Sequence, residues 1–303
     1  MATDAGDSSW PELTVRRIPF EFPDDIDPHW NAAKPEWSHM VNGASLSMPY
    51  LEPYLIKSVR LGLAHIDDPA LREVAADYCA QEGQHYRQHK LFNEILVRKG
   101  YDRLPELEER MEREYAGFLE RRSLKFHLAY AAGFESMALA VGHWLVDDRE
   151  FLFGDSDPRV ASLVLWHFVE EIEHKNAALD VYNAVYGNYG YRIFGLFFAS
   201  FDVMAQSRRA YRAMLQADGL WRNPRSRLRL WRMASRFLAR VLPHMLRCAA
   251  PGHDPRKIDD PRWVADWVAA YRNGDATVPV IDTHRLDGPL GAGTPAATAE
   301  ANA

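Results

Sequence analysis

The chain contains little cysteine. Of its 303 residues only two, Cys79 and Cys248, carry a thiol. Two thiols cannot build a disulfide scaffold, and they cannot supply a four-cysteine zinc or iron–sulfur site within one chain. The metal ligands that remain available are therefore the side chains of His, Asp and Glu.

The sequence also lacks a run of positive charge. Its 36 Lys and Arg are outnumbered by 42 Asp and Glu, which gives a formal net charge of −6. A chain without a basic block has no electrostatic footprint for a phosphate backbone, so nucleic acid is not an expected partner.

Neither a secretory signal nor a membrane span is expected. The N-terminal segment carries Asp4 and Asp7 and has no apolar core, so a cytoplasmic location is the default expectation. The most apolar stretch, residues 128–146, is nearly long enough to cross a bilayer but carries Glu135 near its centre. Because a carboxylate at the bilayer midplane is costly, this stretch favours a buried helix of a bundle.

Helical periodicity dominates the chain from Ser47 onward. It predicts helices over 47–64, 68–99 and 104–122, an apolar helix that begins near Ser123 and a further long helix that ends at Gly187. Additional helices are predicted over 193–216, 225–249 and 261–271. No alternating run of β-branched residues is long enough to build a sheet. The prediction is an all-α chain with a four-helix core and additional C-terminal helices.

The same patterns divide the chain into three parts. Residues 1–46 are rich in Pro, Asp and Trp and predict an irregular arm, residues 47–272 predict one helical domain, and residues 273–303 predict a disordered tail. We also expect that the arm could clasp a second copy of the chain in a homodimer.

Two segments carry a short motif built from metal-binding residue types. Glu82 and His85 form one Glu-x-x-His sequence, and Glu171 and His174 form the other. Residues three apart in an α-helix point to the same side, so each pair can reach a common ion. A helix with an isolated glutamate precedes each motif; these glutamates are Glu52 and Glu135.

The order Glu, Glu-x-x-His, Glu, Glu-x-x-His resembles the ligand set of ferritin-like dinuclear carboxylate proteins. The resemblance covers residues 47–187. It implies a ferritin-like four-helix bundle core that binds two metal ions, with iron as the first expectation and manganese or zinc as alternatives. The ligands that it implies are Glu52, Glu82, His85, Glu135, Glu171 and His174.

Some of these positions have alternatives. Glu52 stands next to a proline at a helix start, where it could instead serve the helix dipole. Glu170 lies four residues before His174 and competes with Glu171, which we prefer because it repeats the spacing of the other motif. Glu173 points away from both and is expected to be solvated or paired with a base.

A further histidine extends the second motif. His167 lies four residues before Glu171, so it shares one stripe of the helix with Glu171 and His174. The sequence His-x-x-x-Glu-x-x-His resembles diiron enzymes of the p-aminobenzoate N-oxygenase type, which implies His167 as a further metal ligand. We assign the catalytic roles to Glu171 and His167; a core histidine bonded to the backbone is the alternative for His167. His89 is expected to be an outer hydrogen-bonding partner, and His143 an ordinary core histidine.

The sequence around the motifs resembles one further family. The segments AQEGQHYRQHKLFNE, GFESMALAVGHW and WHFVEEIEHKNAALDVY are similar to a bacterial family of predicted metal-dependent hydrolases, over residues 19–272. Because hydrolysis in that family is itself a prediction, the resemblance implies metal binding more than it implies hydrolysis.

Three functions fit these motifs. The first is an O2-activating diiron oxidase or oxygenase for a small, largely apolar organic substrate, with an electron-donor protein as a partner, since a buried site shields reactive species from water. Phe134, Met137, Leu139 and the helix over 193–205 could line its pocket, although ordinary core packing is the commoner role of such a helix.

The second function is a metal-dependent hydrolase that uses a bridging hydroxide at the same dinuclear site. The sequence shows no evident general acid and no oxyanion loop for it. The third is an iron-binding or non-catalytic helical protein.

Overall fold

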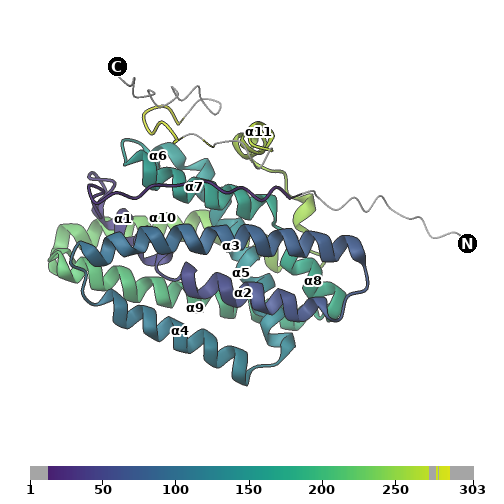
Figure 1. Ribbon diagram of the computed structural model, residues 1–303. Helices are drawn as coiled ribbons and strands as arrows, with labels where there is room; N and C mark the ends of the chain where they lie inside the picture. Colours follow the sequence, from purple (N-terminus) through teal and green to yellow (C-terminus); the bar gives the residue numbers. More distant parts are fainter. Residues whose placement is uncertain (1–12, 273–277, 279, 287–303) are drawn as a thin grey trace, which may run out of the picture.

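The computed structural model describes residues 13–272, 278 and 280–286 (Figure 1). Within these residues the chain folds into α-helices and two short 3-10 helices, without a β-strand. The all-α prediction is confirmed.

Four helices form the centre of the bundle. α2 packs against α3 and α5, and α7 packs against α5 and α3, so that the four enclose a common interior. These helices are α2 (Met48–Leu63), α3 (Pro69–Arg98), α5 (Leu124–Asp147) and α7 (Pro158–Glu173).

Side-chain caps start the three helices that follow loops in this core. Asp68 caps α3, Ser123 caps α5 and Asp157 caps α7, each by accepting a hydrogen bond from a backbone N–H of the first turn. The caps satisfy N–H groups that have no partner inside the helix, and they fix where each helix begins.

α5 lies inside the molecule. Almost all of its residues are buried, because α8 (Ala177–Val185), α9 (Tyr189–Ala217) and α10 (Pro224–Ala249) pack against it in addition to α2 and α7. Burial on all sides explains why this sequence is apolar around its whole circumference. None of the helices in the described part of the chain is long and apolar enough to cross a membrane.

The remaining elements surround this core. α4 (Leu104–Arg121) packs against α2 and α9, and α11 (Arg262–Ala270) packs against α7. The short helix η1 (Leu220–Arg222) joins α9 to α10, and η2 (Pro255–Lys257) precedes α11.

Two helices lie where the sequence predicted none. α1 (Pro35–Ser45) occupies the end of the arm that was expected to be irregular, since Pro35 suits a first helical turn and Trp37 is buried against the bundle. α6 (Arg149–Phe153) is a helix of five residues in the loop before α7.

The single long helix predicted to end at Gly187 is two helices. α7 ends at Glu173, residues 174–176 form a turn, and α8 follows. His174 therefore caps the C-terminus of α7 instead of lying within a helix. The break allows α8 to pack against α2, α3 and α5.

The described part of the arm crosses its own bundle along α3 and α7 (Figure 1, dark purple). Gln81 Nε2 donates to the carbonyl of Thr14, and Gln88 Nε2 donates to the carbonyl of Ile18, both at 2.9 Å. These bonds join α3 to a segment that has no regular structure of its own. The predicted clasp of a second copy stays a prediction.

Residues 280–286 of the predicted disordered tail, 273–303, contact the helical domain. Arg149 Nε donates to the carbonyl of Leu286 at 2.7 Å, and Thr283 Oγ1 donates to the carbonyl of Ser156 at 2.8 Å. Leu286 buries its side chain against the core, and this burial offsets the conformational entropy that the segment loses when it is ordered. The rest of that prediction, apart from Val278, lies outside the described residues.

Candidate metal centre

The fold brings all seven predicted ligands to one place inside the bundle. They come from all four central helices and are at most 3% exposed. Glu52, His85 and His167 form one group, and Glu82, Glu135, Glu171 and His174 form a second; within each group the possible ligand atoms lie within 4.8 Å of one another.

Two carboxylates connect these groups. Glu82 Oε1 lies 3.5 Å from His85 Nδ1 and 3.3 Å from His174 Nε2. Glu171 reaches His167 Nε2 with Oε1, at 2.8 Å, and His174 Nε2 with Oε2, at 3.4 Å. A carboxylate that faces nitrogen ligands from both groups has the position of a bridge between two ions.

The other two carboxylates each belong to one group. Glu52 Oε1 lies 3.7 Å from His167 Nε2, and Glu135 Oε2 lies 3.3 Å from His174 Nε2. The phenol of Tyr78 donates to the second oxygen of Glu135 at 2.7 Å and so fixes its orientation. Glu52 and Glu135 thus have the positions of terminal ligands at opposite ends of the centre.

Several buried polar atoms of the centre lack a partner. Among the described residues, no hydrogen bond reaches either oxygen of Glu52, either oxygen of Glu82, Oε2 of Glu135 or Nδ1 of His85. Burying an ionised carboxylate without a positively charged partner costs several kcal/mol. Four glutamates that face one another in a dry interior therefore fit a site for divalent cations.

Outer hydrogen bonds set the tautomers of two histidines. His85 Nε2 lies 3.0 Å from Glu170 Oε2 and donates its proton to this carboxylate, so Nδ1 is the ring nitrogen that faces the centre. His174 Nδ1 lies 2.9 Å from Gln81 Oε1, so it also carries its proton outward and Nε2 faces the centre. With metal ions bound, these two inner nitrogens would act as ligands. Without metal, burial opposes protonation of the two rings, but the neighbouring glutamates outweigh it; they raise the pKa of His85 to about 9 and the pKa of His174 well above its usual value.

A longer chain of hydrogen bonds sets the tautomer of His167. Ser45 Oγ donates to Asn93 Oδ1 at 2.7 Å, so it accepts from His89 Nδ1 at 2.8 Å. His89 Nε2 can then accept from His167 Nδ1 at 2.6 Å, which would leave His167 Nε2, the nitrogen that faces Glu171, available to a metal ion. The expected outer role of His89 matches this geometry.

Burial and mutual repulsion act unequally on the carboxylates. Burial and the neighbouring glutamates raise the pKa of Glu52 and of Glu135 well above the usual value. Burial also opposes ionisation of Glu171, but in the absence of metal the rings of His167 and His174 donate hydrogen bonds to it and hold its pKa well below the usual value. Glu171 is therefore the carboxylate that the histidines hold in its charged form.

Arg16 pairs with Glu170 at the edge of the centre. Its Nη1 donates to Glu170 Oε1 at 2.9 Å and to Glu173 Oε2 at 2.7 Å, and its Nε donates to the carbonyl of Tyr271. Glu170 thus holds the outer side of His85, whereas Glu171 faces the other carboxylates. The preference for Glu171 agrees with this geometry, and Glu173 is paired with a base as expected.

Replacing Arg16 by Gln should lower the free energy of unfolding by about 3 kcal/mol, because it leaves the buried Glu170 and the partly buried Glu173 without their cation. Chemical denaturation measures this change. Arg113→Gln is the matched control, since that arginine pairs with Glu109 on the surface and should change stability by less than about 0.5 kcal/mol. Equal effects of the two substitutions would contradict the expected role of Arg16.

Comparison with known families bears on this centre. A family model described as "Predicted metal-dependent hydrolase" matches residues 14–259, which is more than half of the chain. The chain belongs to the family of predicted metal-dependent hydrolases. No curated protein and no solved structure gave a match. The resemblance noted for residues 19–272 is confirmed at the level of the family.

In this member of the predicted metal-dependent hydrolases, an apolar cavity of about 330 Å³ leads away from the metal centre. The buried rings of His89 and His167 lie in its wall, and so do the exposed side chains of Met204 and Leu238. The cavity therefore connects the centre with the molecular surface between α9 and α10.

The pocket prediction is correct in part. Phe134 and Met137 line the cavity, whereas Leu139 is buried elsewhere in the core. Of the helix over 193–205, Val203 and Met204 reach the cavity. The side of that helix that carries Leu196 and Ala199 packs as ordinary core against α5, whereas Phe194 and Phe201 are exposed.

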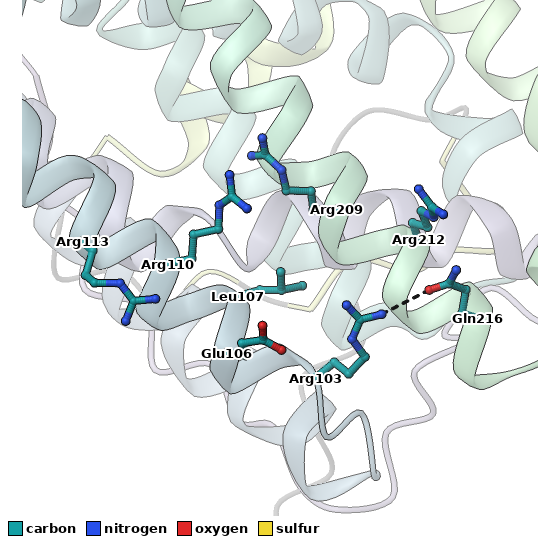
Figure 2. Close-up of a pocket in the computed structure, with 8 residues that line it drawn as sticks. All are labelled: Arg103, Glu106, Leu107, Arg110, Arg113, Arg209, Arg212 and Gln216. Atoms are coloured by element: carbon teal, nitrogen blue, oxygen red, sulfur yellow. Dashed lines mark hydrogen bonds between the residues drawn. The ribbon is translucent and has the colours of Figure 1, made fainter.

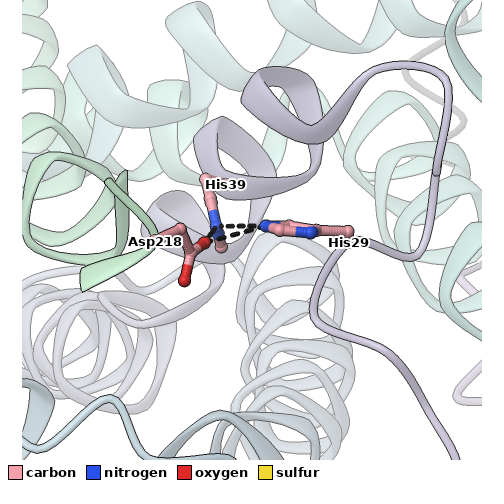
Figure 3. A group of neighbouring side chains, drawn as sticks. All are labelled: His29, His39 and Asp218. Atoms are coloured by element: carbon pink, nitrogen blue, oxygen red, sulfur yellow. Dashed lines mark hydrogen bonds and ion pairs between the residues drawn. The ribbon is translucent and has the colours of Figure 1, made fainter. Parts of the chain in front are cut away.

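One further cluster of histidine and carboxylate side chains lies outside the centre. In Figure 3, Asp218 at the end of α9 meets His29 and His39 from the N-terminal segment, at 2.8 Å and 2.5 Å. Burial opposes ionisation of Asp218, but these histidines hold its pKa well below the usual value. Because its members bond to one another and Tyr101 adds a further bond to Asp218, the cluster is explained as a clamp between these segments.

A second pocket, of about 620 Å³, lies between α4 and α9 (Figure 2). It contains none of the predicted ligands. Its lining residues are Arg103, Glu106, Leu107, Arg110, Arg113, Arg209, Arg212 and Gln216.

The sequence analysis missed the residues that orient the ligands. Tyr78 and Gln81 precede Glu82 by one turn or less, so their position on the same helix was a usable signal. Arg16 carried none, because it lies in a segment without periodicity. His143 is a core histidine as expected: its ring stacks on His244.

Proposed function

We propose that this member of the predicted metal-dependent hydrolases binds two divalent metal ions at the seven residues and uses them to hydrolyse an ester- or amide-type bond of an apolar substrate. The observation that carries the proposal is the set of three histidine ring nitrogens directed at four buried glutamates. The family supports hydrolysis, and the ligand order supports a ferritin-like dinuclear centre.

Two divalent ions in this place would supply Lewis acidity and would lower the pKa of water. Glu82 and Glu171 would bridge the ions, and Glu52 and Glu135 would hold one each. His167 is the ligand that also borders the cavity, so it would position the substrate at the centre. We therefore propose two catalytic residues: Glu171, because it would contact both ions, and His167, because it borders the cavity.

The hydrolase proposal is tested by oxygen-free turnover. Protein reloaded with zinc or manganese should hydrolyse model esters with apolar acyl groups equally fast in air and under argon, and chelator should stop the reaction. Glu171→Gln should lower the rate by at least about 100-fold, since even the loss of an outer ligand partner costs about 10- to 100-fold. Turnover that survives chelation or this substitution would contradict the proposal.

A specific observation favours a second function, O2-dependent oxidation. Apart from the histidines and Arg208, the cavity wall has no side chain that is charged or readily charged, and such a wall suits an apolar substrate that must be oxidised away from water. Ferrous-loaded protein would then develop a new absorption band when O2 is admitted, and an electron donor would be consumed. A spectrum that O2 leaves unchanged would exclude this function.

A further inference from the structure

An exposed apolar stripe runs along α10. Its side chains are between 50% and 64% exposed and follow one another at intervals of three, four or seven residues, which places them on one side of the helix. They are Leu228, Trp231, Leu238, Leu242 and Leu246. A continuous apolar stripe on the surface is a feature of interaction sites, unlike single exposed apolar residues.

α9 extends this stripe into a wider face. Phe201 and Met204 are also exposed, and Met204 lines the same cavity as Leu238. Both helices pack on α5 and α1, and the mouth of the cavity lies between them. We refer to the α10 stripe together with Phe201 and Met204 as the apolar face.

Arginines border the apolar face. α10 contains seven arginines and no acidic residue, although the whole chain has a net charge of −6. Three of them pair with Glu36 or Asp148 on neighbouring helices. Arg225 and Arg232 form no ion pair with the described residues and lie beside the stripe, and Arg208 stands at the cavity mouth.

We propose that the apolar face docks on an anionic lipid bilayer, with the stripe in the headgroup region and the arginines against the lipid phosphates. An amphipathic helix with Leu and Trp on one side and arginine beside them is typical of interfacial membrane helices. A second copy of the same face is a poorer partner, because its α10 would bring arginines and no carboxylates.

Docking in this way places the cavity mouth against the membrane. An apolar molecule dissolved in the bilayer could then enter the cavity and reach His167 without crossing water. This substrate route rests on the proposed function, whereas docking itself does not, since it requires neither metal nor turnover.

Flotation of the full-length protein with vesicles tests the docking. The protein should bind vesicles of phosphatidylcholine with phosphatidylglycerol, bind pure phosphatidylcholine vesicles at least about tenfold more weakly, and be released by high salt. The double variant Trp231→Glu/Leu242→Glu should lose binding by about tenfold or more. Arg225→Gln/Arg232→Gln should reduce the preference for phosphatidylglycerol.

The matched control is Leu61→Glu/Leu91→Glu, which places the same charges at exposed leucines of α2 and α3. It should bind vesicles like the wild type, and circular dichroism checks that all variants fold. Absence of vesicle binding, equal loss in the control, or a wild-type dimer that the α10 variant converts to a monomer would overturn the proposal. Vesicle binding without any hydrolysis would contradict only the proposed function.

Discussion

Replacing Glu171 by Gln should abolish binding of both proposed metal ions. Glu171 faces His167 with one oxygen and His174 with the other, so it is shared by both ligand groups. Glu52→Gln and Glu135→Gln should each remove one ion, because each of these carboxylates belongs to one group only. The account therefore predicts about two ions per chain in the wild type, about one in each terminal variant and none in Glu171→Gln.

Metal analysis by mass spectrometry, after reloading and desalting, measures this series. The matched control is Glu94→Gln, the same substitution at an exposed position of α3, which should leave the metal content unchanged. Loss of the same number of ions in all three ligand variants would show that the groups do not act as two sites.

Glu52→Gln should change the free energy of unfolding in opposite directions in metal-free and in metal-bound protein. In metal-free protein it removes one of four carboxylates that repel one another, and neither oxygen of Glu52 has a hydrogen bond to lose. The free energy of unfolding should then rise by about 1–3 kcal/mol. With metal present the same substitution removes a ligand and should lower it.

Gly195→Val should destabilise the fold by about 3 kcal/mol or more. A Cβ atom at Gly195 would lie 2.1 Å from the carbonyl oxygen of Ala129, and one at Gly133 would lie 2.4 Å from the backbone of Gly195. α5 and α9 therefore cross backbone to backbone, and any side chain here must push the two helices apart. Because α5 carries Glu135, the substitution should also weaken metal binding.

Gly83→Ala is the control for this prediction. Gly83 lies inside α3, and a Cβ atom there would meet nothing within 4 Å. Alanine at this position should raise the free energy of unfolding by about 0.5–1 kcal/mol, since glycine loses more backbone entropy in a helix. Thermal and chemical denaturation measure both variants. A Gly195→Val protein as stable as the wild type would refute the close crossing.

The sequence was informative wherever one helix carried the whole signal. The period of the apolar residues predicted all the long helices, and the caps at Asp68 and Ser123 placed two starts within a residue. The spacing within Glu-x-x-His predicted which side chains would share a face, because that relation is local. The convergence of the four helices on one point was implied by the resemblance of the motif order to that of ferritin-like dinuclear carboxylate proteins.

What the sequence could not predict depends on contacts between distant segments. Arg16 lies 154 residues from Glu170, and no local pattern connects them. α1 was missed because its sequence has no clear amphipathic pattern. Its residues are buried through contacts with α9 and α10, which lie far away in the sequence. The end of α7 at Glu173 was also missed, since His174 has no glycine or proline beside it to mark a helix end.

The metal content of the wild-type protein tests the central claim most directly. Protein purified without chelator, or reloaded in turn with iron, manganese and zinc, should retain about two ions per chain after desalting, held by the two ligand groups. Chelation should lower its melting temperature, because ions that bind only the folded chain stabilise it. A chain that retains less than about one ion under every one of these conditions, and melts at the same temperature with and without chelator, would contradict the account.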